Sequence, residues 1–281
     1  MRVELLPGTG ALVTGVDLRR DPDLSGKAQL QRLYRDRHLL VFRDQDLTDE
    51  RHVEVAGWFG PVRVTDRGAI AYVSNVRPDG LVPEGPLPFH SDMSFTESPL
   101  LGISLHAMEV PRSGASTLFA NAEAAAAGLG PTLAGHLAGR SVRNIAGYGE
   151  GFRGRRKEAD CDPHEPRFDH PAMGPHPVTG QMVLRINGLS SSHLVGLDYQ
   201  ESDRILEEVF AVLYGQENVY EHHWRVGDLV VFDNIAVHHA RRDFDSAERR
   251  TLRRVVLDVR PPMEVDPEVA ALYRQATAGS S

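Results

Sequence analysis

The sequence predicts a mainly β, α+β protein, with a jelly-roll-like β core in one domain and a few peripheral helices. Three observations lead to this fold class. Strand-like runs are short and numerous, amphipathic helices are few, and neither an internal repeat nor a linker divides the 281 residues. A β core of this kind commonly carries its site in the mouth of the barrel.

The helices are predicted from amphipathic spacing and from capping residues. Thr48 is expected to cap a helix that Gly60 and Pro61 stop. Asn121 and Pro131 would begin two short helices that follow one another. The predicted helical segments are residues 25–37, 47–61, 121–139 and 200–215.

The strands are predicted from short apolar or alternating runs bounded by Gly, Pro, Asn and Asp. They are residues 38–44, 69–76, 90–95, 101–110, 180–187, 219–234, 235–244 and 249–259. Residues 142–176 are polar, rich in Gly, Pro, Arg and His, and lack periodicity. A stretch of this kind predicts either a lid or active-site loop, or a solvated insertion. The tail, residues 275–281, is expected to be frayed.

Composition narrows the class of partner. The net charge of −8 argues against nucleic acid or an anionic membrane. No apolar stretch reaches the length of a membrane span, and the start lacks the apolar region of a signal peptide, so we expect a cytoplasmic protein. The lone Cys161 excludes an internal disulfide, and its acidic surroundings argue against a reactive thiolate. The expected partner is a small-molecule substrate, with a homo-oligomer left open.

The stretch "PEGPLPFHSDMSF", residues 83–95, places His90 and Asp92 two positions apart. On a strand, two such residues point to one face and could bind the same ion. A further His would complete a triad of two His and one carboxylate, which leaves positions open on Fe(II). The chain has 13 His, so composition alone readily yields a His-x-Asp pair. The pair needs support from the rest of the chain.

The third ligand is not fixed by the pattern alone. His238 and His239 follow the run "VVFDN", and only one of two adjacent strand residues faces inward. His222 and His223 repeat the ambiguity one strand earlier. We expect most other histidines to be surface or hydrogen-bonding residues; they include His106, His136, His164, His170 and His176.

Late arginines favour a metal site that also takes a dicarboxylate. Arg250 and Arg254 are four apart and so share a strand face, where the fork of a guanidinium can hold a carboxylate. Thr117 could add a hydroxyl donor. Taken singly, the arginines could be surface ion pairs and Thr117 an ordinary strand residue. Together with the His-x-Asp pair and a late His, they describe a site for iron and a dicarboxylate co-substrate.

Several motifs in combination give the chain a family resemblance. They are "GALVTGVDL", "LLVFRDQDLT", "WFGPV", "FHSDMSFTESPLLGISLHAMEVPRSGASTLFAN", "HPVTGQMVLRIN", "HHWRVGDLVVFDN" and "HHARRDF". Almost end to end, the chain resembles the taurine dioxygenase and 2,4-dichlorophenoxyacetate dioxygenase (TauD/TfdA) family. These are Fe(II)- and 2-oxoglutarate-dependent oxygenases that use O₂, with a double-stranded β-helix, or cupin-like, core. The resemblance implies that fold over the single domain 1–281.

The resemblance assigns roles to residues at matching positions. His90 and Asp92 match the metal-binding His-x-Asp, and the distal His ligand follows Asp-Asn after four intervening residues, which implies His239. Thr117 matches the threonine that contacts 2-oxoglutarate. Arg250 matches the arginine that anchors the far carboxylate of that co-substrate. Arg254 matches an arginine that in the taurine enzyme faces the anionic group of the substrate.

The implied reaction is oxidation of an aliphatic C–H bond, chiefly hydroxylation, with release of succinate and CO₂; desaturation and bond cleavage are alternatives. Arg254 implies a small carboxylate, sulfonate or phosphonate as substrate. Asp92 fills the position that related halogenases leave open for halide, which argues against halogenation. Two other readings stay open: a metal-dependent enzyme that does not use 2-oxoglutarate, and a non-catalytic barrel that binds a small acid.

The chain departs from the family pattern at three positions. Phe89 and Phe232 replace tryptophans beside the metal ligands, and Ile235 replaces an arginine after Asp-Asn. The residues before His90, "EGPLP", lack the polar side chains that a taurine-specific pocket would supply. The lack of polar side chains before His90 argues against taurine itself as the substrate.

Overall fold

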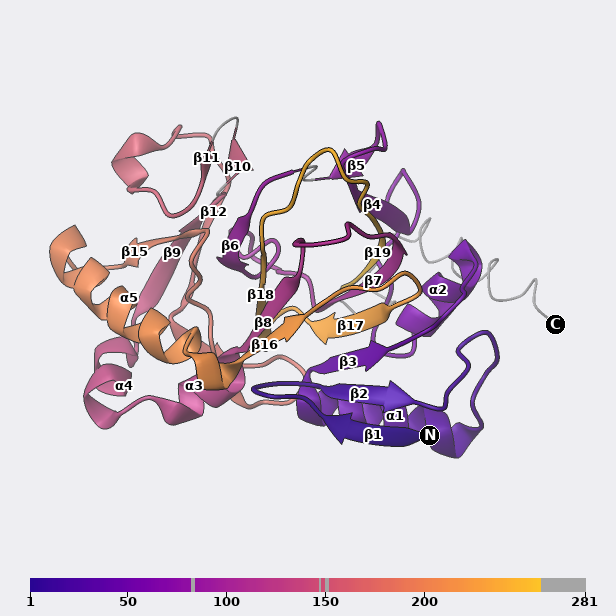
Figure 1. The fold of residues 1–281 in the computed structure, drawn as a ribbon. Helices are drawn as coiled ribbons and strands as arrows, with labels where there is room; N and C mark the ends of the chain where they lie inside the picture. The colour runs from indigo at the N-terminus through magenta and orange to yellow at the C-terminus, as the bar shows by residue number, and fades with distance from the viewer. Residues whose placement is uncertain (82–83, 147, 150–151, 259–281) are drawn as a thin grey trace.

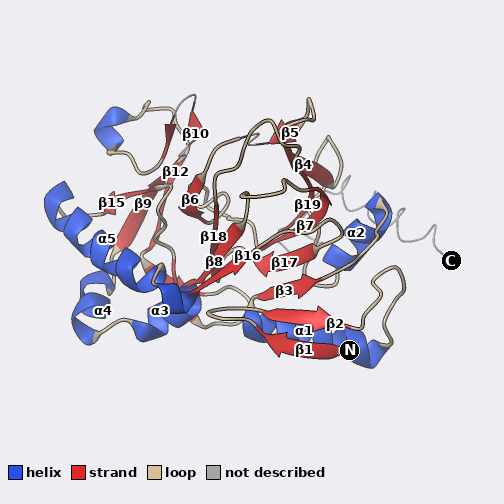
Figure 2. Cartoon of the chain, in the orientation of Figure 1, coloured by secondary structure: helices blue, strands red, loops and turns tan. Residues whose placement is uncertain are grey.

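A computed structural model of the protein describes residues 1–81, 84–146, 148–149 and 152–258. Strands outnumber helices among these residues, and the helices lie at the periphery (Figures 1 and 2). The helices are α1 (Leu24–Arg37), α2 (Asp49–Ala56), α3 (Ala122–Gly128), α4 (Pro131–Leu137) and α5 (Tyr199–Leu213). The strands are β1 (Arg2–Leu5), β2 (Ala11–Thr14), β3 (Leu39–Phe42), β4 (Ile70–Ser74), β5 (Gly80–Leu81), β6 (Leu87–His90), β7 (Gly102–Glu109), β8 (Thr117–Asn121), β9 (Ser141–Ile145), β10 (Tyr148–Gly149), β11 (Phe152–Arg153), β12 (Arg167–Pro171), β13 (Met173–Pro175), β14 (Met182–Leu184), β15 (Ser191–Leu194), β16 (Val219–His222), β17 (Leu229–Asp233), β18 (Val237–Arg241) and β19 (Thr251–Leu257).

The larger sheet has eight strands in the order β1-β2-β3-β17-β7-β19-β4-β5. Neighbours are antiparallel except for β2 with β3 and β4 with β5. Strand β19, late in the chain, therefore lies in the interior of the sheet between β7 and β4. Residues from both halves of the chain must come together to complete this sheet.

The smaller sheet has four strands in the order β16-β8-β18-β6. Its residues Phe119 and Val237 are buried in one cluster with Ile103 and Phe232 of the larger sheet. The rings of Phe119 and Phe232 meet edge to face, with centroids 5.1 Å apart. The two sheets thus face each other across an apolar interior, which confirms the predicted jelly-roll-like core with peripheral helices.

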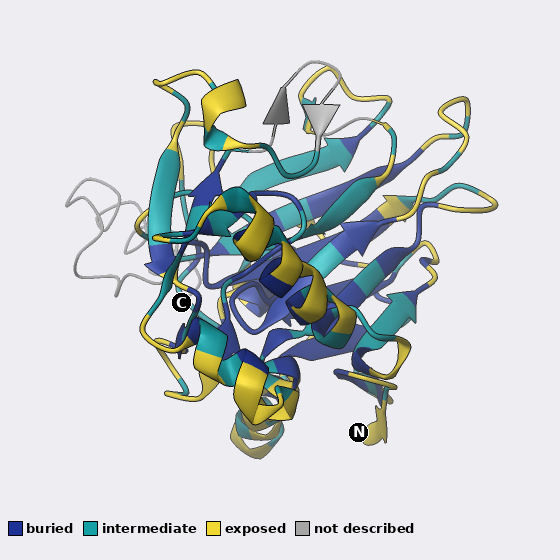
Figure 3. Ribbon diagram, turned by 90° about the vertical axis from the view of Figure 1, so that its left-hand side faces the viewer, coloured by how far each residue is buried: buried dark blue, intermediate teal, exposed yellow. Residues whose placement is uncertain are grey.

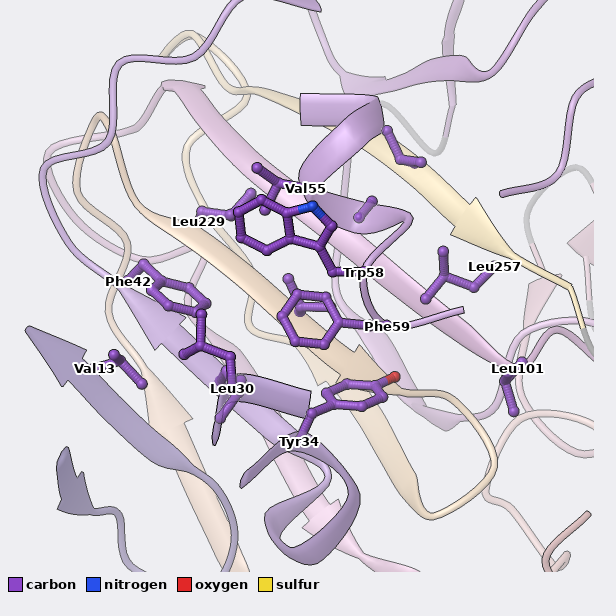
Figure 4. Packing of buried hydrophobic residues seen from close by; sticks show 14 of the residues in the cluster. Val13, Leu30, Tyr34, Phe42, Val55, Trp58, Phe59, Leu101, Leu229 and Leu257 are labelled. Atoms are coloured by element: carbon purple, nitrogen blue, oxygen red, sulfur yellow. The ribbon is translucent and has the colours of Figure 1, made fainter. Parts of the chain in front are cut away.

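Helices α1 and α2 cover the other face of the larger sheet. Figure 4 shows Leu30 and Tyr34 of α1 and Val55 of α2 packed toward the sheet residues Phe42 and Leu229. The predicted cap of α2 is confirmed, because the Thr48 side chain accepts a hydrogen bond from the Arg51 amide. The predicted end at residue 61 is wrong, because the helix stops at Ala56 and residues 57–60 form turns.

Helices α3, α4 and α5 form a second layer with the three-stranded sheet β12-β9-β15. Ile205, Val209 and Leu213 recur every four residues on α5 and are fully buried, while the opposite side of the helix is exposed (Figure 3). Asn121 caps α3, and Pro131 stands in the first turn of α4. Both predicted starts are confirmed.

Three predicted elements are wrong. The strand predicted at residues 219–234 is two strands, β16 and β17, with residues 223–228 between them. Residues 142–176 are not one aperiodic loop, since β9, β12 and β13 lie largely or wholly within them. Strands β9 and β12 form an antiparallel pair in which polar residues stand opposite each other: Arg143 donates to both carboxylate oxygens of Asp169, at 2.6 and 2.7 Å, so apolar alternation does not mark these strands. The predicted strand 90–95 also fails, because β6 ends at His90 and a turn follows in which Met93 has φ of 61°.

Among the described residues, none of the helices has the length and apolarity that crossing a bilayer requires. The tail for which we expected fraying lies outside the described residues.

Candidate metal centre

His90 and His239 lie side by side because of strand register. His90 is the last residue of β6, and His239 of β18 is its direct partner in the antiparallel pair. Directly opposed residues project from the same face of a sheet, and the centroids of the two rings are 4.1 Å apart. His238 points to the other face, where its Nδ1 lies 3.2 Å from the Tyr214 hydroxyl. The structure therefore places His239, rather than its neighbour, at the site.

Asp92 reaches the two histidines from a turn rather than from a strand. Its backbone amide donates to Asn234 Oδ1 at 2.8 Å, and Asn234 Nδ2 donates back to the Asp92 carbonyl at 3.0 Å. The same Nδ2 also donates to the Leu100 carbonyl at 3.0 Å. Asn234 thus ties the turn after β6 to the end of β17. The expectation that a strand would align His90 with Asp92 gave the correct neighbours for a wrong reason.

The three side chains form a compact group of metal-binding atoms. Asp92 Oδ1 lies 3.2 Å from His90 Nε2 and 3.8 Å from His239 Nε2. One ligand atom from each residue lies within 4.8 Å of the others, and all three residues are buried or half-buried. Two imidazoles and one carboxylate on one side of an ion are the donor set of the facial triad.

The hydrogen bond of His90 shows that the atoms facing each other in the triad suit a cation. His90 Nδ1 lies 2.8 Å from the Pro88 carbonyl, which can only accept, so Nδ1 carries the hydrogen. In the neutral ring, Nε2 then presents a lone pair to Asp92 Oδ1. Two electron-rich atoms face each other there, and a cation bound by both relieves their repulsion. The tautomer fixed by a backbone carbonyl is also the usual arrangement for a metal-binding His.

The charge state of the group agrees with metal binding. Burial works against ionisation of Asp92, but the charge of Arg254 outweighs it and lowers the pKa of its carboxyl. Burial lowers the pKa of His239 well below its usual value, so this ring is neutral. A carboxylate and a neutral imidazole are the forms that bind metal ions.

A cavity of about 640 Å³ opens beside the triad. Its volume is within the range of small-molecule sites. Arg250, Leu252, Arg254 and Val256 line it at every second position, as the predicted sharing of a strand face requires. Much of the remaining lining is apolar and includes Leu81, Leu87, Met93, Phe95, Leu100, Ile103, Leu105 and Phe232. Among the described residues that line it, none belongs to segment 142–176, so the lid role of that segment stays a prediction.

Arg250 is a buried cation with unused hydrogen-bond donors. Its exposed fraction is 2%, and neither Nε nor Nη1 has an acceptor among the described residues. Burial, and to a smaller extent the nearby Arg241, lowers the pKa of Arg250 to about 9, so the guanidinium stays charged at neutral pH. The Phe244 ring centroid lies 5.9 Å from the guanidinium carbon of Arg250, but a buried charge whose hydrogen-bond donors are unmet is still costly. The position therefore suits an anion supplied by a ligand.

Thr117 and Arg254 line the same cavity. Thr117 begins β8 and is buried, with an exposed fraction of 4%. Arg254 Nη2 donates to Asp92 Oδ2 at 2.5 Å, while Oδ1 of that carboxylate faces the histidines. Arg254 thus orients Asp92 so that one oxygen is left to bind the ion. All six residues singled out from the sequence line one cavity; they are His90, Asp92, Thr117, His239, Arg250 and Arg254.

The other histidines serve the fold in several cases. His176 Nε2 lies 3.0 Å from Asp233 Oδ2, and His222 Nε2 lies 3.1 Å from Asp228 Oδ2. His170 Nε2 lies 2.8 Å from the Thr96 carbonyl. These partners lie outside the triad, as expected for hydrogen-bonding residues.

Sequence reasoning missed one residue that positions the triad. Asn234 served only as a landmark for counting to His239, yet it holds the turn that carries Asp92. Its signal was an Asp-Asn pair at the end of an apolar strand, which is an unusual place for a buried amide. Of the departures from the family pattern, Phe89 stacks on Tyr214 and Phe232 lies against the His239 ring, with centroids 4.2 and 4.9 Å apart.

Comparison with known proteins shows the family of the chain. A family profile described as "Taurine catabolism dioxygenase TauD, TfdA family" matches residues 2–256. The chain is 31% identical over 272 residues to an alpha-ketoglutarate-dependent 2,4-dichlorophenoxyacetate dioxygenase of Cupriavidus pinatubonensis, covering 89% of this chain and 94% of that protein. It is 30% identical over 262 residues to an (S)-phenoxypropionate/alpha-ketoglutarate-dioxygenase of Sphingobium herbicidovorans, covering 86% and 89%.

A solved structure supports the fold. The crystal structure of a taurine dioxygenase from Burkholderia xenovorans superposes with a TM-score of 0.75 at 25% sequence identity. The match covers 92% of this chain and 90% of that chain. The double-stranded β-helix predicted from the family resemblance is thereby confirmed.

Proposed function

The chain belongs to the TauD/TfdA family of alpha-ketoglutarate-dependent dioxygenases, and we propose that it is an Fe(II) enzyme that hydroxylates an aliphatic C–H bond of a small anionic substrate. One oxygen atom of O₂ enters the product and the other enters succinate, while 2-oxoglutarate loses CO₂. The observation that carries the proposal is a triad of two His and one Asp on a cavity that also contains a buried, unpaired arginine.

His90, Asp92 and His239 would hold the iron. The donor set and the tautomer of His90 support this assignment. Iron bound there would supply the redox chemistry that joins O₂ to the oxidation of two organic substrates. Because three protein ligands occupy one side of the ion, the other side is left for 2-oxoglutarate and O₂.

Arg250 and Thr117 would hold the far carboxylate of 2-oxoglutarate. A carboxylate accepts two parallel hydrogen bonds from a guanidinium, and Arg250 has Nε and Nη1 available. The hydroxyl of Thr117 adds a third donor on the lining of the same cavity. These contacts would fix the co-substrate in one orientation, and the apolar lining would limit entry of water.

Arg254 would act on both the triad and the substrate. Its bond to Asp92 Oδ2 leaves Oδ1 as the single ligand oxygen. Since Arg254 also lines the cavity, we expect it to attract an anionic group of the substrate. Two relatives are dioxygenases of 2,4-dichlorophenoxyacetate and of (S)-phenoxypropionate, and these two substrates favour a carboxylate as the anionic group of the substrate here. Family membership favours this activity over the two alternatives left open by the sequence, while a cytoplasmic location and a homo-oligomer stay predictions.

The proposal is tested without O₂. Fe(II) and 2-oxoglutarate are added to metal-free protein, and the visible charge-transfer band of the chelated complex is measured. We expect the band in the wild type and in His238→Ala, and its loss in His239→Ala. A wild-type protein that binds iron but gives no band would contradict chelation of 2-oxoglutarate, and a band unaffected by His239→Ala would contradict the triad.

A further inference from the structure

Thr117, which lines the cavity, accepts a hydrogen bond from a tryptophan that is not part of the lining. Trp224 Nε1 donates to Thr117 Oγ1 at 2.9 Å. Both side chains are buried, with exposed fractions of 9% and 4%. They meet because β16 pairs with β8 so that His222 lies opposite Thr117, which places Trp224 just beyond the end of β16.

This bond limits what the threonine hydroxyl can do. An indole N–H can only donate, so Thr117 Oγ1 must accept from it. The single hydroxyl hydrogen of Thr117 is then available to an acceptor elsewhere, and Thr117 lines the cavity that contains the unpaired Arg250. We propose that Trp224 is a positioning residue that holds the Thr117 hydroxyl as a donor to the far carboxylate of 2-oxoglutarate. The inference rests on the proposed function of Thr117.

Trp224 is itself held in one orientation. The His222 ring meets it edge to face, with centroids 4.5 Å apart and planes at 86°. His222 Nε2 donates to Asp228 Oδ2 at 3.1 Å, so its Nδ1 is left to accept from the Tyr220 hydroxyl at 3.2 Å. Asp228 is further bonded by Arg43 and by the Arg225 amide. A chain of contacts thus runs from Arg43 through Asp228, His222 and Trp224 to Thr117.

The alternative is that Trp224 only fills space in the apolar interior, where it packs with Phe119 and Leu105. A purely structural role would affect every ligand of the cavity alike. A role through Thr117 would affect only ligands that carry a far carboxylate. The matched pair 2-oxoglutarate and 2-oxopentanoate separates the two roles, since both chelate iron in the same way and only the first has the second carboxylate.

The experiment titrates the anaerobic Fe(II) protein with each acid and follows the visible charge-transfer band. Trp224→Phe removes the N–H and keeps an aromatic ring. We expect its dissociation constant for 2-oxoglutarate to rise about fivefold, the usual effect of losing one neutral hydrogen bond. That for 2-oxopentanoate should change less than about twofold. Trp58→Phe is the matched control, because Trp58 is also buried but belongs to the cluster beneath α1 and α2, and it should change neither constant.

A double-mutant cycle tests the route through the threonine. Thr117→Val should weaken 2-oxoglutarate binding, whereas Thr117→Ser, which keeps the hydroxyl, should bind it as the wild type does. In the Thr117→Val background, Trp224→Phe should weaken binding little further. Equal weakening of both acids by Trp224→Phe, or additive effects in the cycle, would overturn the inference while leaving 2-oxoglutarate binding intact. If the wild-type protein bound both acids equally, the proposed site for the far carboxylate would be wrong, and the inference would fall with it.

Discussion

Arg250 and Arg253 are equally buried but differ in their hydrogen-bond partners. Arg250 and Arg253 each have an exposed fraction of 2%. Arg253 faces α2, where its guanidinium donates to His52 Nδ1 at 3.1 Å, to His106 Nδ1 at 3.1 Å, to the Leu47 carbonyl at 2.8 Å, and to the Asp49 carboxylate. Arg250 faces the cavity, where Nε and Nη1 have no acceptor among the described residues.

The difference separates a charge that completes the fold from one that awaits a ligand. Arg253 is paired and hydrogen-bonded on all sides, so its burial cost is met within the protein. Arg250 has the same burial without these bonds, so the protein is less stable for carrying it unless an anion binds. Substitution of Arg253 should therefore lower the stability of the protein. Substitution of Arg250 should leave the stability unchanged or higher and weaken ligand binding.

The largest expected effect is loss of stability in Arg253→Met. The substitution leaves Asp49, His52 and His106 without their common donor. We expect the free energy of unfolding to fall by about 3–5 kcal/mol, as is usual when a buried network loses one partner. Urea denaturation followed by circular dichroism measures it. A loss below about 1 kcal/mol would mean that these bonds contribute little, and the contrast with Arg250 would disappear.

Arg250→Met should show the reverse pattern. Removing a buried, unpaired cation should leave the free energy of unfolding of the ligand-free protein unchanged or higher. The dissociation constant for 2-oxoglutarate should rise on the order of 100-fold, because its carboxylate loses a charged partner. The same denaturation and anaerobic titration measure both quantities. A stability loss of several kcal/mol with unchanged binding would contradict the distinction drawn between the two arginines.

Asn234→Ala should act on the metal through the Asp92 turn. Its two hydrogen bonds to Asp92 resemble the outer contacts that orient metal ligands, whose loss typically weakens metal affinity about 10–100-fold. Mn(II) titration by calorimetry measures it. The matched control is Asn218→Ala, because Asn218 is also a buried amide with two backbone partners, but those partners are the carbonyls of Asn121 and Leu213 and not a residue of the triad. Equal Mn(II) affinities for the two variants would exclude this role of Asn234.

The smallest expected effect is on the pH dependence of stability, through His52, which accepts a hydrogen bond from Arg253. Burial, then the charge of Arg253, lowers the pKa of His52 well below its usual value of 6.5. The unfolded chain binds a proton near pH 6.5 that the folded protein does not, so stability falls as the pH drops below that value. Between pH 6.5 and 5.5 this single group should contribute about 1 kcal/mol of the loss. Unfolding of His52→Gln across this range should show a shallower decline, and an unchanged slope would show that His52 takes up a proton in the folded state.

The sequence alone could identify the triad but could not explain its assembly. The spacing after Asp233 and Asn234, with strand alternation, pointed to His239, and the structure brings that ring to His90. The turn that carries Asp92 could not be predicted, because it depends on an amide more than a hundred residues further along the chain. The strand expected there was wrong for the same reason.

The run "ERRTLRRVVLDV" shows the limit most clearly. Its four arginines look alike in the sequence, yet the structure gives each a different environment. Arg249 pairs with Glu109 at the surface, Arg253 joins the network beneath α2, and Arg250 and Arg254 line the cavity. Alternation could separate Arg253 from Arg254. Only the packing partners could show that Arg254 bonds to Asp92 while Arg250 is left unpaired.

The interior position of β19 has a consequence for the order in which the protein assembles. Strands β4 and β7 belong to the first half of the chain, but they are joined only through β19. Until residues 251–257 have been synthesised, both strands have a free edge, and free edges pair readily with other chains. His239 is likewise added late, so the nascent chain cannot form the complete triad until its last strands emerge. Contacts between such distant residues slow folding, and assembly of the barrel and loading of the metal therefore become late events that occur together.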